Sequence, residues 1–154
     1  MNPYQKAVRW AGTKRWFAVF GRHVLTPLDK LMWKRSTSPT TFGTYFPMGY
    51  LTTVGRRSGR PHTVPLLYVV PAAALAAVVG TNFGGPDHPH WVANLEANPQ
   101  ATWRVDEDIE VIARRATSEE HRQLWAEFVS MWPGYEGYVE RSQREPRLFV
   151  IERR

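Results

Sequence analysis

The chain has 154 residues, of which 43% are hydrophobic and 13% aromatic, so it can form one packed domain and is not a disordered segment. It has no cysteine, which excludes disulfides, thiolate nucleophiles, iron–sulfur clusters and thiolate metal sites. The net charge of +6 is concentrated in the first 35 residues, which hold eight basic residues and one acidic residue, Asp29, so any argument from charge concerns this N-terminal arm alone.

The arm is predicted to form basic amphipathic helices. Between residues 3 and 23, apolar residues recur every four positions, and Thr26-Pro27 starts a second short helix. This pattern is typical of a helix that lies on an anionic membrane surface, and also of a helix that packs on its own domain. A polar linker follows at residues 36–41, so we expect an arm over residues 1–41 and a compact domain over residues 42–154.

No part of the sequence approaches the roughly 20 apolar residues that a membrane-spanning helix needs. Basic residues interrupt every apolar stretch near the N-terminus, which is unlike a signal peptide. We therefore expect a cytoplasmic protein whose arm can make it peripheral at the inner face of the cell membrane. A nucleic-acid partner is not expected, because the excess charge and the patterned aromatic residues lie in different parts of the chain.

The compact part contains six short predicted strands, at residues 50–54, 63–70, 75–80, 101–105, 110–116 and 148–151. The third is rich in alanine and valine, which predicts burial on both faces, and the fourth and fifth alternate as a hairpin that turns at Glu107-Asp108. Short connections imply antiparallel neighbours, and closing such a sheet removes its unpaired edges. The predicted fold is therefore mainly β, a small antiparallel barrel with flanking helices.

Three helices are predicted within this part. The first covers residues 90–97. Thr117 and Glu120 form a capping box that opens the second, which runs to about Trp132. Pro133-Gly134 ends it, and a short tyrosine-bearing helix follows.

The turn between the first two strands holds two glycines, a serine and three arginines, in the order Gly55-Arg56-Arg57-Ser58-Gly59-Arg60. Glycine lets a backbone approach a ligand closely, and arginine offers paired donors to phosphate or carboxylate. The turn therefore indicates an anion cradle, with a solvated hairpin loop as the alternative. His62 follows closely, either as a further anion contact or as an exposed strand residue.

Three further patches carry polar and aromatic groups, at residues 80–85, 88–95 and 132–138. His88 and His90 do not predict a metal site, because no second His or Cys pair lies elsewhere in the chain. Trp132, Tyr135 and Tyr138 recur every three residues, which places them on one side of a helical turn, over an aromatic ligand or over the core. With no evident nucleophile, metal or acid–base pair, an enzyme of this sequence needs a bound cofactor.

Taken in order, these patches resemble the F420H2-dependent quinone reductases, also called deazaflavin-dependent nitroreductases, of actinobacterial type. The resemblance covers roughly residues 50–151, and its matching elements are residues 51–59, Pro65-Leu66, Gly84-Gly85, Pro89-His90-Trp91, Asn94-Leu95, Asn98-Pro99 and the tyrosine pair. It implies a split β-barrel, similar to FMN-binding barrels, and a site for reduced coenzyme F420, an 8-hydroxy-5-deazaflavin with a phosphodiester and an oligoglutamate tail.

The family pattern also implies the residues of that site. The coenzyme phosphate would be held by Arg56, Arg57 and Ser58. The deazaflavin ring would be lined by His62, Thr63, Val64, Pro65, Leu66, Leu67, Gly80, Thr81, Asn82 and Phe83, and closed on its other side by His90, Trp91 and Asn94. The family often has lysine at the position of Arg57, arginine at that of His62 and serine at that of Asn82.

The implied activity is hydride transfer from reduced F420 to an electron-poor acceptor, a quinone, an enone or a nitro compound. Trp132, Tyr135 and Tyr138 would cover the acceptor, and the two tyrosine hydroxyls would donate a hydrogen bond or a proton. Trp132 replaces a tyrosine of the family. Two alternatives are an FMN-binding split-barrel oxidoreductase, whose phosphate the same arginines would hold, and a deazaflavin-binding carrier without catalysis.

Overall fold

The computed structural model describes residues 3–20, residue 23 and residues 46–154. The helix predicted after Thr26 and the linker predicted at residues 36–41 lie outside these described residues. None of the described helices is long and apolar enough to cross a membrane.

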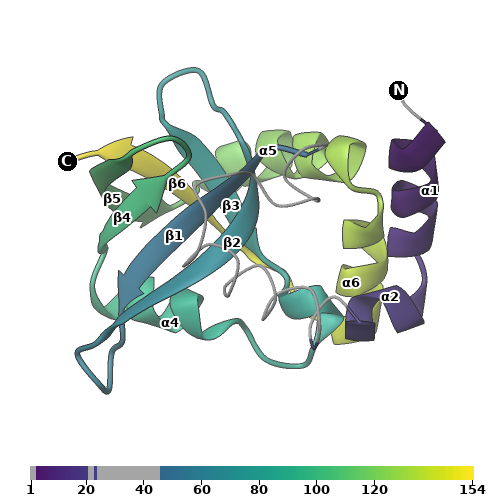
Figure 1. Cartoon of the computed structure of the whole chain (residues 1–154), viewed down its shortest axis with the longest axis horizontal. Coiled ribbons are helices and arrows are strands. Elements are labelled where there is room, and N and C mark those ends of the chain that lie inside the picture. Colours follow the sequence, from purple (N-terminus) through teal and green to yellow (C-terminus); the bar gives the residue numbers. More distant parts are fainter. Residues whose placement is uncertain (1–2, 21–22, 24–45) are drawn as a thin grey trace.

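Six antiparallel strands close into a barrel (Figure 1). They are β1 (Met48–Val54), β2 (Pro61–Val69), β3 (Ala76–Gly80), β4 (Gln100–Arg104), β5 (Asp108–Arg115) and β6 (Arg147–Arg153). Their order around the barrel is β1-β2-β3-β6-β5-β4, and the pairing of β1 with β4 closes it. The predicted six-stranded antiparallel barrel is confirmed, and closure pairs the strand edges that an open sheet would expose.

The turn between β4 and β5 lies earlier than predicted. Asp108 belongs to β5 and pairs with Arg104, so the turn covers residues 105–107 rather than Glu107-Asp108. The Arg104 guanidinium donates hydrogen bonds of 2.5 and 2.6 Å to the Asp108 carboxylate, which ties the two strand ends together.

Strand β3 is buried on both faces, as predicted, because it separates two apolar clusters. On one face Val78 packs with Phe149 and with residues from β1, β4 and β5, inside the barrel. On the other face Val79 packs with Phe128 and other residues of the helices outside the barrel. The strand therefore needs apolar residues at successive positions instead of an alternating pattern.

The helices of the compact part are α4 (His90–Ala97), α5 (Ser118–Met131) and α6 (Gly134–Ser142), with a short helix η2 (Asn82–Gly84) before α4. The bounds predicted for α4 are confirmed. The capping box of α5 is also confirmed, since the Glu120 amide donates to Thr117 Oγ1 at 3.2 Å and the Thr117 amide to Glu120 Oε2 at 2.8 Å. Helix α5 ends at Met131, with Trp132 as its C-cap.

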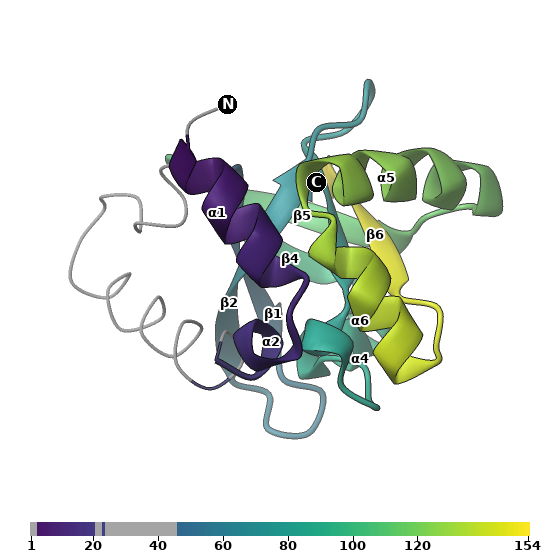
Figure 2. The ribbon, with the colours of Figure 1, turned by 90° about the vertical axis from the view of Figure 1, so that its right-hand side faces the viewer.

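The single helix predicted over residues 3–23 is instead two helices, α1 (Pro3–Gly12) and α2 (Arg15–Phe20). The chain breaks at Thr13, whose hydroxyl donates to the Trp10 carbonyl at 2.7 Å and so competes with helical bonding. Gly12 lies against Trp132, so closely that a Cβ there would be 2.0 Å from the indole ring. Helix α1 thus packs beside α6, and α2 packs beside η2 (Figure 2).

Candidate active site

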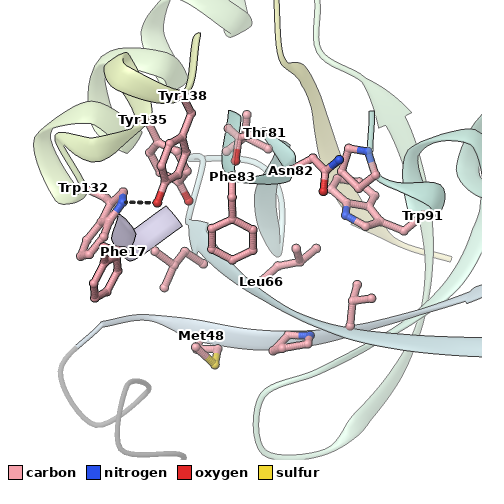
Figure 3. A pocket seen from close by; sticks show the side chains of 15 residues that line it. Phe17, Met48, Leu66, Thr81, Asn82, Phe83, Trp91, Trp132, Tyr135 and Tyr138 are labelled. Carbon is pink, nitrogen blue, oxygen red and sulfur yellow. Dashed lines mark hydrogen bonds between the residues drawn. The ribbon is translucent and has the colours of Figure 1, made fainter. Parts of the chain in front are cut away.

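A cavity of about 220 Å³ lies between strand β2, the η2 segment and helices α2 and α6 (Figure 3). Its walls are formed by Phe17, Met48, Val64, Pro65, Leu66, Leu67, Val79, Thr81, Asn82, Phe83, Pro89, Trp91, Trp132, Tyr135 and Tyr138. Most of these side chains are apolar, and the few polar groups are hydroxyls and one amide. Small-molecule sites have this composition, in which a few polar groups orient a largely apolar ligand.

Three aromatic residues form one wall of the cavity. The prediction that they share one helical turn is wrong, because Trp132 caps the end of α5, whereas Tyr135 and Tyr138 belong to α6. The two tyrosine rings meet edge to face, with centroids 5.8 Å apart and an interplanar angle of 83°. Such contacts hold the rings in place, so the wall is preformed.

The Tyr138 hydroxyl has one hydrogen bond whose direction is certain. Trp132 Nε1 is 3.4 Å from the Tyr138 oxygen, and an indole nitrogen can only donate. The hydroxyl proton of Tyr138 is therefore free to point at a ligand. Burial raises the pKa of Tyr138, while the bond from Trp132 and the nearby Arg141 charge lower it by less, so the hydroxyl is protonated at neutral pH.

Tyr135 is also buried, and its hydroxyl differs from that of Tyr138 in having no hydrogen-bond partner among the described residues. Burial, and secondly the neighbouring Tyr138, raise the pKa of the Tyr135 hydroxyl far above its ordinary value. Within the described part of the chain, the Tyr135 hydroxyl makes no hydrogen bond. It is a neutral group that fills the wall and can donate only to a ligand that enters the cavity.

The arginine turn joins β1 to β2 and so directly precedes the strand whose residues 64–67 line the cavity. The Ser58 and His62 side chains pack closely against Gly55, where a Cβ would be 2.5 Å from Ser58 Oγ. Ser58 Oγ is 3.3 Å from His62 Nε2. The side chains of Arg56 and Arg57 are exposed and have no ion-pair partner among the described residues, so they are available to an anion.

Helix α4 connects the turn with the cavity. Trp91, in its first turn, lines the cavity, and Asn94, one turn later, reaches the arginine turn. The Asn94 side chain accepts from the Arg56 amide at 3.1 Å and donates to Thr53 Oγ1 at 3.1 Å. Asn94 is buried, and its two hydrogen bonds connect α4 with the end of β1 and with the first residues of the turn.

The predicted site residues fall into two groups. Eleven of them line the cavity, namely Val64, Pro65, Leu66, Leu67, Thr81, Asn82, Phe83, Trp91, Trp132, Tyr135 and Tyr138. The others lie outside its lining, namely Arg56, Arg57, Ser58, His62, Thr63, Gly80, His90 and Asn94. Of this second group, Thr63 bonds to Thr52 across the barrel strands at 2.8 Å, and His90 is exposed at the start of α4.

Four lining residues were not among the predicted site residues: Phe17, Met48, Val79 and Pro89. Pro89 lies within a segment that was singled out and Val79 directly precedes one, so their places in the sequence were a usable signal. Phe17 and Met48 had no such signal in the sequence, because only the packing of α2 and of the start of β1 against the other walls brings them to the cavity.

Comparisons with known proteins bear on the family and the fold of the chain. The sequence model of the F420H(2)-dependent quinone reductase family matches residues 30–153. A solved structure described as an F420-H2 dependent reductase (FDR-A) is 31% identical, with a TM-score of 0.62, and the match covers 69% of this chain and 94% of that one.

Two other solved structures are similar. One, described as a domain-swapped dimer, is 28% identical, with a TM-score of 0.64 and coverage of 81% of this chain and 96% of that one. The other is HutZ, a heme storage protein from Vibrio cholerae, at 18% identity, with a TM-score of 0.54 and coverage of 82% and 90%. At that identity the likeness to HutZ concerns the fold alone.

Proposed function

The chain belongs to the F420H2-dependent quinone reductase family, an enzyme family whose cofactor is coenzyme F420, and we propose that it reduces a small quinone, enone or nitro compound. The strongest support is the pairing of two features: an apolar cavity lined by Tyr138, and an arginine turn that precedes the lining strand β2 and has no ion-pair partner among the described residues. The pair fits a ligand with a flat apolar ring at one end and anionic groups at the other.

The size of the cavity supports this division of the ligand. Its volume of about 220 Å³ is below the roughly 300–1,000 Å³ typical of sites that enclose a whole ligand. It can enclose a ring system and leave the phosphodiester and glutamate tail outside. We propose that Arg56, Arg57 and Ser58 bind the phosphate, and that β2 and the η2 segment hold the ring.

When bound, reduced F420 supplies a hydride from C5 of its deazaflavin. The protein must align the acceptor and stabilise the negative charge that develops on the acceptor oxygen, and preformed donors in a water-poor cavity do this well. Tyr138 is the residue we assign to that donation, because Trp132 occupies its oxygen and leaves its proton free. Tyr135 and Trp132 shape the acceptor wall.

A titration with two cofactors tests the proposal. The purified protein is titrated separately with F420 and with FMN while the fluorescence of tryptophan is followed, since Trp91 and Trp132 line the cavity. We expect F420 to bind more tightly, and reduced F420 to be oxidised when a quinone, an enone or a nitroaromatic compound is added. Tighter FMN binding would favour the FMN-dependent alternative, and F420 binding without oxidation by any acceptor would favour a carrier.

We further propose that helices α1 and α2 dock the enzyme on an anionic membrane, where an apolar quinone would dissolve. Trp10, Trp16 and Val19 expose 64%, 61% and 59% of their surface, which is unusual for large apolar side chains so close together. Lys14 lies over the Trp10 ring, with Nζ 5.1 Å from its centroid, so cationic and aromatic groups share one surface. Interfacial helices combine these two kinds of side chain.

The double variant Trp10→Ser/Trp16→Ser is expected to lose most of its binding to vesicles of anionic phospholipid, because both exposed indoles are removed. Co-sedimentation with the vesicles measures this, and the rate with a water-soluble quinone should be unchanged. Ile112→Ser is a matched control, because it removes an exposed apolar residue from the barrel. Equal vesicle binding by the wild type and the double variant would refute the docking proposal.

A further inference from the structure

The segment that carries Asn82 and Phe83 into the cavity has a backbone that must be held in place. Asn82, Phe83 and Gly84 have φ angles of 50°, 52° and 76°, three consecutive residues in the left-handed region. Only glycine adopts that region freely, and other residues persist there when their surroundings hold them. The loop supplies part of the support itself, since the Gly84 amide donates to Thr81 O at 3.0 Å and Asn82 Nδ2 donates to Asp87 O at 2.9 Å. The other bonds that hold it come from a distant residue.

Arg144 provides that support. It lies in the connection between α6 and β6, and its side chain meets the loop at residues 80–88. Nε donates to Gly85 O at 3.3 Å, Nη1 to Gly80 O at 3.2 Å and to His88 Nδ1 at 2.9 Å, and Nη2 to Thr81 O at 2.8 Å and to Asp87 O at 2.9 Å. Since a guanidinium has five N–H groups, all of them bind this one loop.

The bond to His88 also defines the state of that histidine. Arginine can only donate, so His88 Nδ1 must be an unprotonated acceptor and the ring must be neutral. The pKa of His88 is lowered by burial first, and then by Arg144, Arg147 and Arg115, against an opposing effect of Glu96. At neutral pH the ring is therefore in the form that accepts from Arg144.

Arg144 itself is not part of the cavity lining, whereas Thr81, Asn82 and Phe83 are. On the cavity side, the Phe83 ring lies against Tyr138, with centroids 6.0 Å apart. Arg144 thus binds four carbonyl groups of the loop, while Thr81, Asn82 and Phe83 form part of the cavity wall. Figure 3 shows Phe83 directed into the space between Tyr138 and Leu66.

We propose that Arg144 is a positioning residue: it holds residues 80–88 in the shape in which Asn82 and Phe83 face the cavity, and so sets the affinity for the ligand ring without contacting it. The role in coenzyme affinity rests on the proposed function, whereas the role in loop shape does not. One arginine side chain thus satisfies several carbonyl groups of the loop at once.

The variant Arg144→Met is compared with Arg114→Met, a matched control. Arg114 also makes a multidentate network, to Glu120 and Glu152, but it ties β5 to α5 and β6 and not to the cavity. Hydrogen–deuterium exchange of residues 80–88 needs no ligand. We expect about tenfold faster exchange there in Arg144→Met, and wild-type exchange in that segment in Arg114→Met.

Coenzyme affinity is the second readout. If the correctly shaped loop falls to about a tenth of the population, the dissociation constant for F420 rises about tenfold in Arg144→Met. Arg114→Met should lower the melting temperature without changing that constant. Arg144→Lys keeps the charge but has three donors instead of five, so its dissociation constant should rise less. If Arg144→Met does not fold, Arg144→Lys takes its place, with Arg114→Lys as the control.

Two outcomes overturn the inference. One is exchange at residues 80–88 that is no faster in the Arg144 variant than in its Arg114 counterpart. The other is wild-type F420 affinity in an Arg144 variant, which would make the residue purely structural. If the wild-type protein does not bind F420 at all, the proposed function fails, and the exchange comparison still decides whether Arg144 shapes the loop.

Discussion

Replacement of Tyr138 by phenylalanine is expected to lower kcat by about 100-fold while the affinity for F420 stays close to that of the wild type. The Tyr138 hydroxyl is oriented by Trp132 Nε1, which donates to its oxygen and leaves its proton available at the aromatic wall. Phenylalanine keeps the ring and its edge-to-face contact with Tyr135, so the shape of the cavity is retained. Steady-state kinetics with a water-soluble quinone would measure kcat.

Tyr135→Phe is the matched control for this experiment. Tyr135 is buried and its hydroxyl bonds to no described residue, so no neighbour holds the hydroxyl in one direction, and we expect a smaller fall in kcat. Because burial raises the pKa of Tyr138 above its ordinary value of 10.0, its ionisation should not reduce kcat below about pH 10. A Tyr138→Phe enzyme with wild-type kcat would show that another group stabilises the acceptor oxygen.

Replacement of Gly12 by alanine is expected to destabilise the protein by about 1–3 kcal/mol, although alanine is the better helix former by about 1 kcal/mol. The new Cβ would lie 2.0 Å from the Trp132 ring. Trp132 cannot retreat, because Phe17 and Phe46 pack against it with centroids 5.7 and 5.6 Å away. The overpacking therefore outweighs the gain in helix propensity.

Urea unfolding would measure this loss, and the KM for the quinone should rise as well, because Trp132 and Phe17 both line the cavity. Gly137→Ala is the matched control in α6. Its Cβ would meet only the end of the flexible Arg141 side chain, at 3.1 Å, so we expect neutral or slightly increased stability. Equal unfolding free energies for Gly12→Ala and wild type would mean that α1 does not pack against Trp132 in solution.

The contact of Gly12 with Trp132 also bears on the division of the chain. The boundary between an arm at residues 1–41 and a domain at residues 42–154 stays a prediction. The family match starts at residue 30, which leaves α1 and α2 outside it. Nevertheless Phe17 of α2 lines the cavity, so the arm forms part of the cavity wall. Deletion of the arm is expected to open the acceptor wall, which is why point variants test membrane docking better.

Local sequence determined much of the fold. Alternation and short connections predicted the six strands, and the barrel is confirmed. The capping box at Thr117 is an interaction over three residues, so it could be recognised from the residues alone. The arginine turn was visible for the same reason, because Gly55, Ser58 and His62 interact over a few positions. The family could also be identified from such patches taken in order, and the comparisons confirm it.

What only the tertiary structure decided involves residues far apart in the chain. Gly12 lies against Trp132, and the loop at residues 80–88 bonds to Arg144, about 60 residues away. Asn94 carried a site prediction, but its bond to the Arg56 amide exists only because α4 packs on β1. Local sequence sets backbone preference and the side that an apolar residue faces, whereas closure of the barrel decides which distant atoms meet. The arginine turn was therefore readable from the sequence, and the supports that hold it and the cavity were not.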